Sequence, residues 1–325
     1  MNPSPATRRT SLVLITGGAG FIGSHLVERL LADGKRVVVI DDLSTGSREN
    51  LRAVESHPCL RVIQSKISTC AELPELAANA EFIFHLAATV GVELVVRSAL
   101  QVLETSFHET RILLRAAVRN RTPLLLTSTS EVYGKSRKPA FSEDDDLLIG
   151  PPYQPRWSYA SAKLTDEFLA LACAREKGLP VIIVRLFNTV GPRQTGRYGM
   201  VLPRFIAAAK KNKPLQVFGD GKQTRCFCCV HDVVEALVRL QNCEKARGQI
   251  FNVGSTEEIS ILDLAKRVVE TLGSKSKIEL IPYDQAYAPG FDDMRRRKPM
   301  VKKLERFVKF RPRTTLREII RLTAR

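Results

Sequence analysis

The sequence predicts an α/β fold in which a doubly wound parallel sheet is followed by a smaller C-terminal lobe. Short runs rich in β-branched residues alternate with longer helical patterns in the first half of the chain. A glycine-rich segment, TGGAGFIG, joins the first strand to the first helix, and the alternation loosens after Asn188. Strands and helices alternating in this way are typical of Rossmann-type parallel sheets covered by helices on both faces.

The elements follow in the order expected for βαβ units. The first strand ends at the glycine-rich segment, and the next helix ends before Gly34, as helices often do. Later strands are short apolar runs, and the helices between them carry apolar residues at helical spacing. The predicted strands are 12–16, 36–40, 61–64, 82–86, 124–128, 180–187 and 250–253, and the helices are 22–33, 73–80, 99–119, 157–177 and 203–211.

Composition excludes several classes of protein. The 325 residues are 44% apolar and 26% charged, which is ordinary for a globular chain and wrong for a disordered one. Every apolar run is far shorter than the roughly 20 residues that span a bilayer. We find no export signal, so we expect a cytoplasmic protein without membrane partners.

The formal net charge of +16 is concentrated near the C-terminus. Residues 295–325 hold thirteen Lys or Arg against two acids, a net of +11. No signature of a DNA- or RNA-binding module accompanies them, so we expect no specific nucleic-acid binding. A basic segment near a phosphorylated ligand and a solvated helix face explain the charge equally well.

Seven cysteines, an odd number without framework spacing, fit reduced thiols. Cys226, Cys228 and Cys229, with His231, form a cluster that could be read as metal ligands. Its spacing matches no zinc pattern. Small apolar thiols on a half-buried strand explain it better, and we predict no metal site.

The glycine-rich segment predicts a dinucleotide site. Gly17, Gly20 and Gly23 open a helix, where they allow a tight turn, close approach of a pyrophosphate and close packing of helix on strand. Asp41 ends the second strand 24 residues after Gly17, where a carboxylate accepts hydrogen bonds from a ribose diol and repels a 2′-phosphate. We therefore expect NAD rather than NADP. The neighbouring Asp42 fits a loop or helix-cap residue.

Tyr159 and Lys163 lie four residues apart in a predicted helix, so they share one face. An ammonium and a bound nicotinium both favour phenolate, so we expect a lowered pKa for Tyr159, which then acts as a base. The alternative is a chance pair on a solvated helix face. The glycine-rich segment favours the catalytic interpretation.

Four hydroxyl residues, Thr127 to Ser130, precede Glu131 at the end of the fifth predicted strand. Doubly wound folds bind ligands at this edge of the sheet. Glu131 is the informative residue, because hydride exchange needs no extra carboxylate, whereas elimination or decarboxylation needs a polar group for a second step. The alternative is a loop acid that caps the next turn.

Several motifs together resemble the extended short-chain dehydrogenase/reductase family of nucleotide-sugar enzymes, over nearly the whole chain. These are TGGAGFIG, HLAA, STSEVYG, YASAK and LFNTVGPR. Three further segments look most like UDP-glucuronate decarboxylases, which include the decarboxylase domain of the polymyxin-resistance enzyme and the UDP-apiose/UDP-xylose synthases. They are FSEDDDLLIGPPYQPRWSYASAK, GKQTRCF and RRRKP. The resemblance implies an NAD-binding domain at 1–187 and a nucleotide-sugar-binding lobe at 188–325, with a part near 232–255 returning to the first domain.

The resemblance also implies roles for single residues. Tyr159 is the base at the sugar C4 hydroxyl, Lys163 is its activator and ribose ligand, and Thr129 is a hydrogen-bond partner of that hydroxyl. Ser130 and Glu131 lie near the substrate carboxylate. The implied substrate contacts are Asn188, Arg193, Arg225 and Arg297, and the implied cofactor contacts are Gly17, Gly20, Phe21, Ile22, Gly23, Asp41, Asp42, Leu86, Ala87, Ala88, Tyr159 and Lys163.

The chain departs from the family pattern at three places. Lys66 stands where the family usually reads the adenine amino group with an Asp. The segment 89–96, TVGVELVV, is closer to 4-epimerases than to the Ser- and Pro-rich loop of xylose synthases. Ser106 stands where many relatives have Asn.

The resemblance implies NAD-dependent decarboxylation of UDP-glucuronate through a 4-keto intermediate, by a homodimer. The product is UDP-xylose if the hydride returns and the 4-keto-pentose if it does not. Apiose is not expected, because the apiose-forming relatives carry Cys where this chain has Ser130. A UDP-glucose or UDP-glucuronate 4-epimerase, which needs no Glu131, stays open, as does an idle NAD or nucleic-acid binding module.

Overall fold

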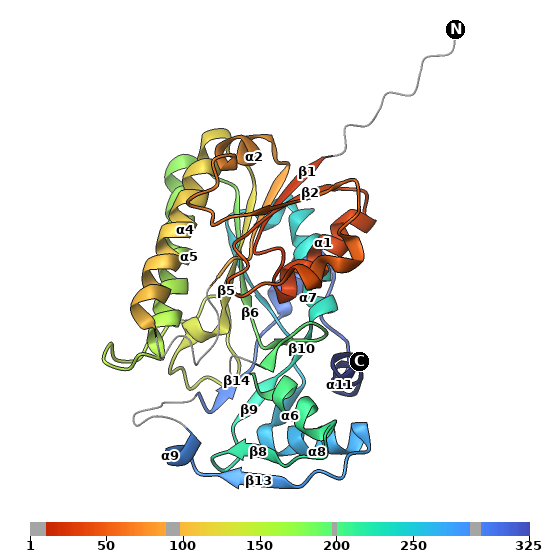
Figure 1. Ribbon diagram of the computed structural model, residues 1–325. Helices are drawn as coiled ribbons and strands as arrows, with labels where there is room; N and C mark the ends of the chain where they lie inside the picture. Colours follow the sequence, from red (N-terminus) through yellow and green to blue (C-terminus); the bar gives the residue numbers. More distant parts are fainter. Residues whose placement is uncertain (1–10, 89–97, 197–199, 287–293) are drawn as a thin grey trace.

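The computed structural model describes residues 11–88, 98–196, 200–286 and 294–325 (Figure 1). Residues 1–10, at the start of the segment in which we found no export signal, lie outside the described residues, as does the 89–96 segment that resembles 4-epimerases. Among the helices within these four ranges, none is long and apolar enough to cross a membrane.

Seven parallel strands form the main sheet, in the order β11-β6-β5-β4-β1-β2-β3. The strand β1 is buried along its whole length, which explains why its sequence is a continuous apolar run rather than an alternating one. The strand β11 returns from late in the chain to pair with β6. The strands are β1 Leu12–Thr16, β2 Arg36–Asp41, β3 Leu60–Gln64, β4 Phe82–His85, β5 Leu124–Thr129, β6 Val181–Leu186 and β11 Gln249–Val253.

Helices cover both faces of this sheet (Figure 1). One face packs against α2, α4 and α5, and the other against α1, α7 and α10. The predicted doubly wound α/β fold is confirmed. The helices are α1 Phe21–Ala32, α2 Leu73–Asn79, α4 Ala99–Asn120, α5 Trp157–Lys177, α7 Val230–Gln241 and α10 Lys302–Val308, and short 3-10 helices lie at Arg48–Val54, Ser130–Tyr133 and Glu244–Ala246.

The order of the strands creates a crevice at the carboxyl edge of the sheet. From β1 the chain proceeds through β2 and β3 to one edge, whereas β4, β5, β6 and β11 lie on the other side of β1. The segments that follow β1 and β4 therefore diverge, and ligands of doubly wound folds bind at this point. The glycine-rich segment follows β1 and residues 86–88 follow β4, so both border the crevice.

A smaller lobe forms the lower part of the molecule in Figure 1. Its core lies between three helices and a two-stranded parallel sheet. The helix α6 begins two residues before Pro203, earlier than predicted, because proline is tolerated in the first turn of a helix. The elements are α6 Val201–Ala209, α8 Ile261–Leu272, α9 Tyr283–Ala286, α11 Leu316–Ala324, β7 Thr189–Val190, β8 Leu215–Phe218, β9 Thr224–Cys226, β10 Cys228–Cys229, β12 Glu258–Ser260, β13 Ile278–Ile281 and β14 Arg296–Arg297.

The cysteine cluster corrects our expectation of one half-buried strand. Cys226 ends β9, whereas Cys228 and Cys229 form the separate strand β10, and all three are fully buried. The chain crosses between two cores here, because Cys228 packs into the core of the main sheet and Cys229 into that of the lobe. Within the described ranges no three His, Cys, Asp or Glu side chains are grouped as metal ligands.

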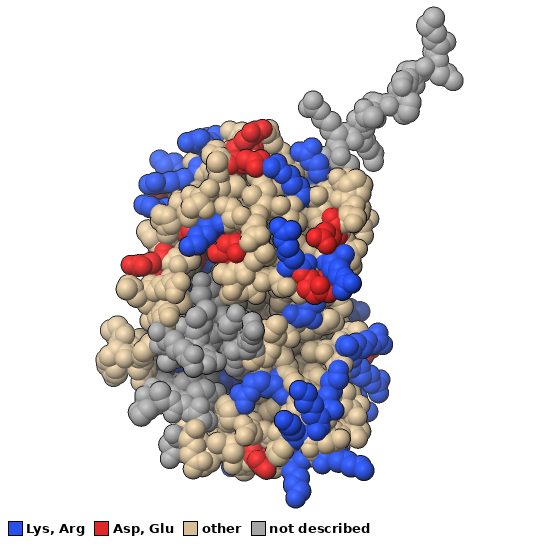
Figure 2. Space-filling model, viewed as in Figure 1, with Lys and Arg blue, Asp and Glu red and all other residues tan. Residues whose placement is uncertain are grey.

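Positive charge gathers over the lobe. Figure 2 shows Lys and Arg crowded at the lower right, the region where Figure 1 places α11. Part of the basic 295–298 segment is paired, since Arg296 and Lys298 contact Glu258 and Arg295 contacts Asp220. These three pairs are partly exposed, so each contributes little to stability.

Candidate active site

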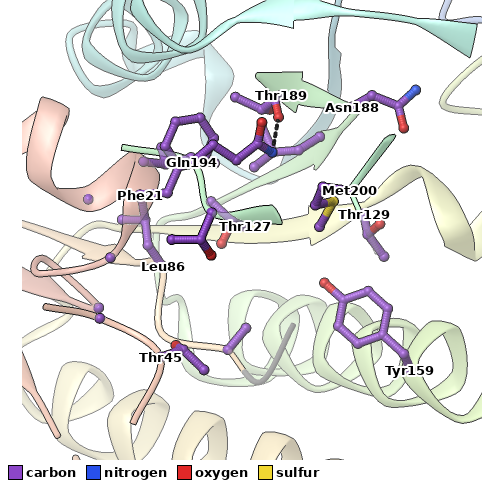
Figure 3. Close-up of a pocket in the computed structure, with 18 of the residues that line it drawn as sticks. Phe21, Thr45, Leu86, Thr127, Thr129, Tyr159, Asn188, Thr189, Gln194 and Met200 are labelled. Carbon is purple, nitrogen blue, oxygen red and sulfur yellow. Dashed lines mark hydrogen bonds between the residues drawn. The ribbon is translucent and has the colours of Figure 1, made fainter. Parts of the chain in front are cut away.

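A cavity of about 870 Å³ lies at the carboxyl edge of the main sheet and extends to the lobe. Residues of the glycine-rich turn, the end of β5 and the start of α5 line it on one side, and residues of β8, β9 and β14 line it on the other. Its size is typical of cavities that bind small molecules and cofactors. Figure 3 shows side chains that follow the glycine-rich turn (Phe21), end β5 (Thr129) and begin α5 (Tyr159) pointing into a shared space.

The glycine-rich turn fits a dinucleotide. A Cβ at Gly23 would lie 2.1 Å from the Gly17 carbonyl oxygen, so only glycine lets α1 pack this closely on the turn. A Cβ at Gly20 would meet just that oxygen, at 3.2 Å, and no side chain caps α1. The backbone amides at the start of α1 therefore face an open space, which suits a pyrophosphate.

Asp41 and Asp42 lie in different environments. The Asp41 carboxylate is buried and accepts hydrogen bonds from the backbone amides of Ala19 and Leu43, both at 2.9 Å. Burial raises its pKa, and these two amides oppose the rise. Asp42 is exposed and caps its own loop, since Oδ1 accepts from the Ser44 amide at 2.9 Å. Asp42 therefore has the loop-capping role that its position suggested, although it also borders the cavity.

The predicted cofactor residues, apart from Lys163, all border the cavity. Lys66, where the chain departs from the family pattern, borders it too, between Ser65 and Ile67. The bordering cofactor residues are Gly17, Gly20, Phe21, Ile22, Gly23, Asp41, Asp42, Leu86, Ala87, Ala88 and Tyr159.

The hydroxyl run at the end of β5 divides into two parts. The hydroxyls of Thr127 and Ser128 are hydrogen-bonded to buried acceptors. Thr127 Oγ1 donates to the His85 carbonyl at 3.0 Å, and Ser128 donates to the buried Glu167. Thr129 begins a 3-10 turn by accepting a hydrogen bond from the Glu131 amide at 3.2 Å. This turn fixes the backbone that carries Glu131 into the cavity.

The Tyr159 hydroxyl points toward Thr129 (Figure 3). Desolvation raises the pKa of Tyr159, the Glu131 and Asp166 carboxylates raise it further, and Thr129 opposes the rise as a hydrogen-bond partner. This corrects our expectation of a lowered pKa. The ammonium of Lys163 does not offset these effects, because its Nζ donates to Asp166 Oδ2 at 3.0 Å.

Lys163 is buried and is not among the described residues that border the cavity. Asp166 lies one turn further along α5 and is completely buried. Ser106 of α4 donates to the same Asp166 oxygen at 2.8 Å. Ser106 thus joins α4 to the lysine through a shared carboxylate.

Glu131 lies between two arginines from different parts of the chain. Arg297 Nη1 donates to Oε1, and Arg156 Nη2 donates to Oε2 at 3.3 Å. Burial alone would raise the pKa of Glu131, but Arg297, Arg156 and Arg225 together lower it to about 2. Glu131 is therefore ionised at any physiological pH.

The predicted substrate residues border the cavity, and two of them join segments of its walls. Arg193 pairs with Glu28 of α1 at 2.5 Å, which fastens the segment after β7 to the main domain. Asn188 Nδ2 donates to the Cys226 carbonyl at 3.1 Å. Arg225 is buried in β9, beside Arg297 of β14 in the strand register.

Sequence reasoning missed one residue that borders the cavity and two buried residues that interact with Lys163. Arg156 comes three residues before Tyr159, and this helical spacing could have placed both at the cavity. Asp166 likewise follows Lys163 by three residues. His85 is buried between Thr16 and Thr110, and burial, together with Lys163, lowers its pKa to about 3. It therefore stays neutral.

Comparisons with known proteins agree with this geometry. The family model described as "NAD dependent epimerase/dehydratase family" matches residues 13–254. A UDP-N-acetyl-alpha-D-glucosaminuronate decarboxylase of Bacillus cytotoxicus is 43% identical over 300 residues, which cover 92% of each chain. UDP-glucuronic acid decarboxylase 4 of Arabidopsis thaliana is 35% identical over 326 residues, which cover 97% of this chain and 68% of the relative.

A solved structure shares the fold over almost the whole length. It is a UDP-glucuronic acid 4-epimerase of Bacillus cereus in complex with UDP-glucuronic acid and NAD, 28% identical with a TM-score of 0.86, and the match covers 96% of this chain and 98% of that one. The family model spans most of the chain, and the NAD in its description suits the open turn at Gly20. The chain belongs to the NAD-dependent epimerase/dehydratase family, and its cofactor is NAD.

Proposed function

We propose that this protein decarboxylates a UDP-hexuronic acid, UDP-glucuronate in the first instance, through a 4-keto intermediate. The observation that carries the proposal is the ionised Glu131 beside Tyr159, held between Arg156 and Arg297. Hydride exchange at C4 requires no such carboxylate. Loss of the substrate carboxylate as CO2, in contrast, needs a charged group to guide this second step.

The chain's own residues perform the proton and charge transfers. Tyr159 removes the proton of the C4 hydroxyl, with Thr129 as its hydrogen-bond partner. When bound, NAD would be the acceptor for the hydride that leaves C4, and it can return that hydride in a later step. The C4 ketone is β to the C5 carboxylate, so the electrons of the breaking C–C bond flow into the ketone as CO2 leaves. Hydroxyls at Thr129 and Tyr159 stabilise the enolate that results.

Two uronates are candidate substrates. The Arabidopsis relative is named for UDP-glucuronic acid, while the more similar Bacillus cytotoxicus relative is named for the 2-acetamido uronate. Both carry the C5 carboxylate on which the mechanism depends. The 43% identity with the second relative makes UDP-N-acetylglucosaminuronate the second candidate substrate.

The test is to incubate the protein with each uronate and measure NADH absorbance, evolved CO2 and the product by NMR. We expect CO2 and a pentose or 4-keto-pentose. Tyr159→Phe should abolish both NADH formation and CO2 release, whereas Glu131→Gln should slow CO2 release more than oxidation. If the wild type interconverts C4 epimers without CO2 and tolerates Glu131→Gln, the protein is instead a 4-epimerase like the Bacillus cereus relative.

We also propose that the working molecule is a homodimer joined through α4 and α5. These helices lie side by side on one edge of the molecule (Figure 1). Leu100 and Phe107 of α4 and Phe168 of α5 are 70%, 42% and 63% exposed. Large exposed apolar side chains on two neighbouring helices are typical of a protein–protein contact.

A further inference from the structure

Two arginines from different parts of the fold bind the two carboxylate oxygens of Glu131. Oε2 accepts from Arg156, at the start of α5 in the main domain, and Oε1 accepts from Arg297, in β14 beside the lobe. The Arg156, Arg297 and Glu131 side chains are only 7%, 13% and 15% exposed. A buried carboxylate is thus shared by two cations that belong to different parts of the fold.

The Arg156 position is fixed by the main domain. The next residue, Trp157, is 2% exposed, packs into a core cluster, and donates from Nε1 to Gln154 at 3.0 Å. Gly150 packs so closely on that ring that a Cβ there would lie 2.0 Å from Nε1. Arg156 precedes Tyr159 by three residues, so both side chains approach the cavity from the same turn of α5.

Arg297 is placed differently. It belongs to β14, a two-residue strand that pairs with β9, where it lies in register with Arg225. A guanidinium that faces the cavity from the lobe side suits the carboxylate of an entering uronate, because its planar fork binds carboxylates in bidentate fashion. If Arg297 turns to the substrate, Glu131 loses one of its two counterions.

We propose that Arg156 is a positioning residue that keeps Glu131 ionised and correctly oriented while Arg297 binds the substrate carboxylate. The proposal rests on the decarboxylase function proposed above. Glu131 is then a fixed negative charge beside the C5 carboxylate, which destabilises that charge and favours its departure as neutral CO2. Without Arg156, a buried Glu131 that has lost Arg297 takes up a proton instead.

The charged and titratable groups that face Glu131 come from three elements. Arg156 and Tyr159 belong to the start of α5, Arg225 to β9, and Arg297 to β14. Three arginines against one carboxylate leave a surplus of positive charge, which matches an anionic substrate. With the substrate on Arg297, Arg156 becomes the nearest remaining cation that hydrogen-bonds Glu131.

The experiment uses four variants of the full chain loaded with NAD: Arg156→Gln, Arg156→Lys, Glu131→Gln and the double variant Arg156→Gln/Glu131→Gln. CO2 release and NADH formation are measured across pH with UDP-glucuronate. Arg156→Gln should slow CO2 release roughly tenfold to a hundredfold and shift its acidic limb to higher pH, and Arg156→Lys should restore part of the rate. The double variant should be no slower than Glu131→Gln. The exposed Arg295→Gln serves as the control and should leave both rates unchanged.

A second measurement separates this proposal from the proposed function. The Glu131 carboxyl is titrated by ¹³C NMR in a Tyr159→Phe background with NAD and UDP-glucuronate, which allows no turnover. Arg156→Gln should raise the pKa of Glu131 well above that of the parent complex. If wild type evolves no CO2, the decarboxylase function fails, yet this titration still tests Arg156. Two outcomes would overturn the role of Arg156. One is that Arg156→Gln leaves the pKa of Glu131 unchanged. The other is that the double variant releases CO2 more slowly than Glu131→Gln by the same factor by which Arg156→Gln slows the wild type.

Discussion

Asp41 ends β2 with both carboxylate oxygens bound by backbone amides, one of them in the glycine-rich turn. The carboxylate therefore stabilises the turn as well as facing the cavity. A 2′-phosphate placed here would meet a buried negative charge, while a ribose diol would find an acceptor.

We predict that Asp41→Asn reduces the preference for NAD over NADP by about tenfold or more, because it removes the repelling charge. Isothermal titration calorimetry with both cofactors measures the ratio. The exposed Asp33→Asn at the end of α1 is the control and should leave it unchanged. If wild type binds the two cofactors equally well, Asp41 does not discriminate between them.

The raised pKa of Tyr159 predicts a pH-dependent oxidation step. Below that pKa the phenol is mostly protonated, so the rate of NADH formation should rise about tenfold for each pH unit. Glu131→Gln removes a negative charge that raises the pKa, so the profile should move to lower pH. Stopped-flow absorbance with UDP-glucuronate follows both profiles. A rate independent of pH would show that Tyr159 is not the base.

At the scale of elements, the contact between α1 and the glycine-rich turn depends on Gly23. Gly23→Ala should destabilise the protein by about 1–3 kcal/mol and weaken NAD binding, because its Cβ would overlap the Gly17 carbonyl. Gly34→Ala is the matched control, since its φ of +75° strains an alanine but no atom lies within 4 Å. Thermal unfolding with and without NAD compares them. If Gly23→Ala and Gly34→Ala reduce the NAD-induced rise in Tm equally, the contact between α1 and the glycine-rich turn is not what NAD binding depends on.

The sequence predicted elements better than it predicted side-chain partners. Predicted and observed bounds coincide for β1 and α5, because apolar spacing along a strand or helix is a local property. The pairing of Glu131 with Arg297 joins residues 166 positions apart, and it depends on how the lobe packs on the main domain. Spacing could show that Tyr159 and Lys163 share a face, but not that Asp166 binds the ammonium.

At the scale of the whole molecule, the exposed apolar residues of α4 and α5 predict the oligomeric state. Wild type should run as a dimer of the 36.2 kDa chain in sedimentation velocity. Leu100→Glu/Phe168→Glu should yield monomers, because charges would be buried in the contact. Leu280→Glu, at a 55% exposed position on β13, should remain dimeric. A monomeric wild type would exclude this contact.

The returning strand β11 has a consequence for how the chain is made. One face of the sheet is covered by α7 and α10, and its edge beside β6 is completed by β11, all of which are synthesised after the first six strands. On the ribosome, a nascent chain that ends near residue 187 therefore presents an apolar face that only α1 covers in part, and an open strand edge. Such surfaces bind chaperones and pair with other chains. The apolar face and the strand edge are both covered only when the last third of the chain has been translated.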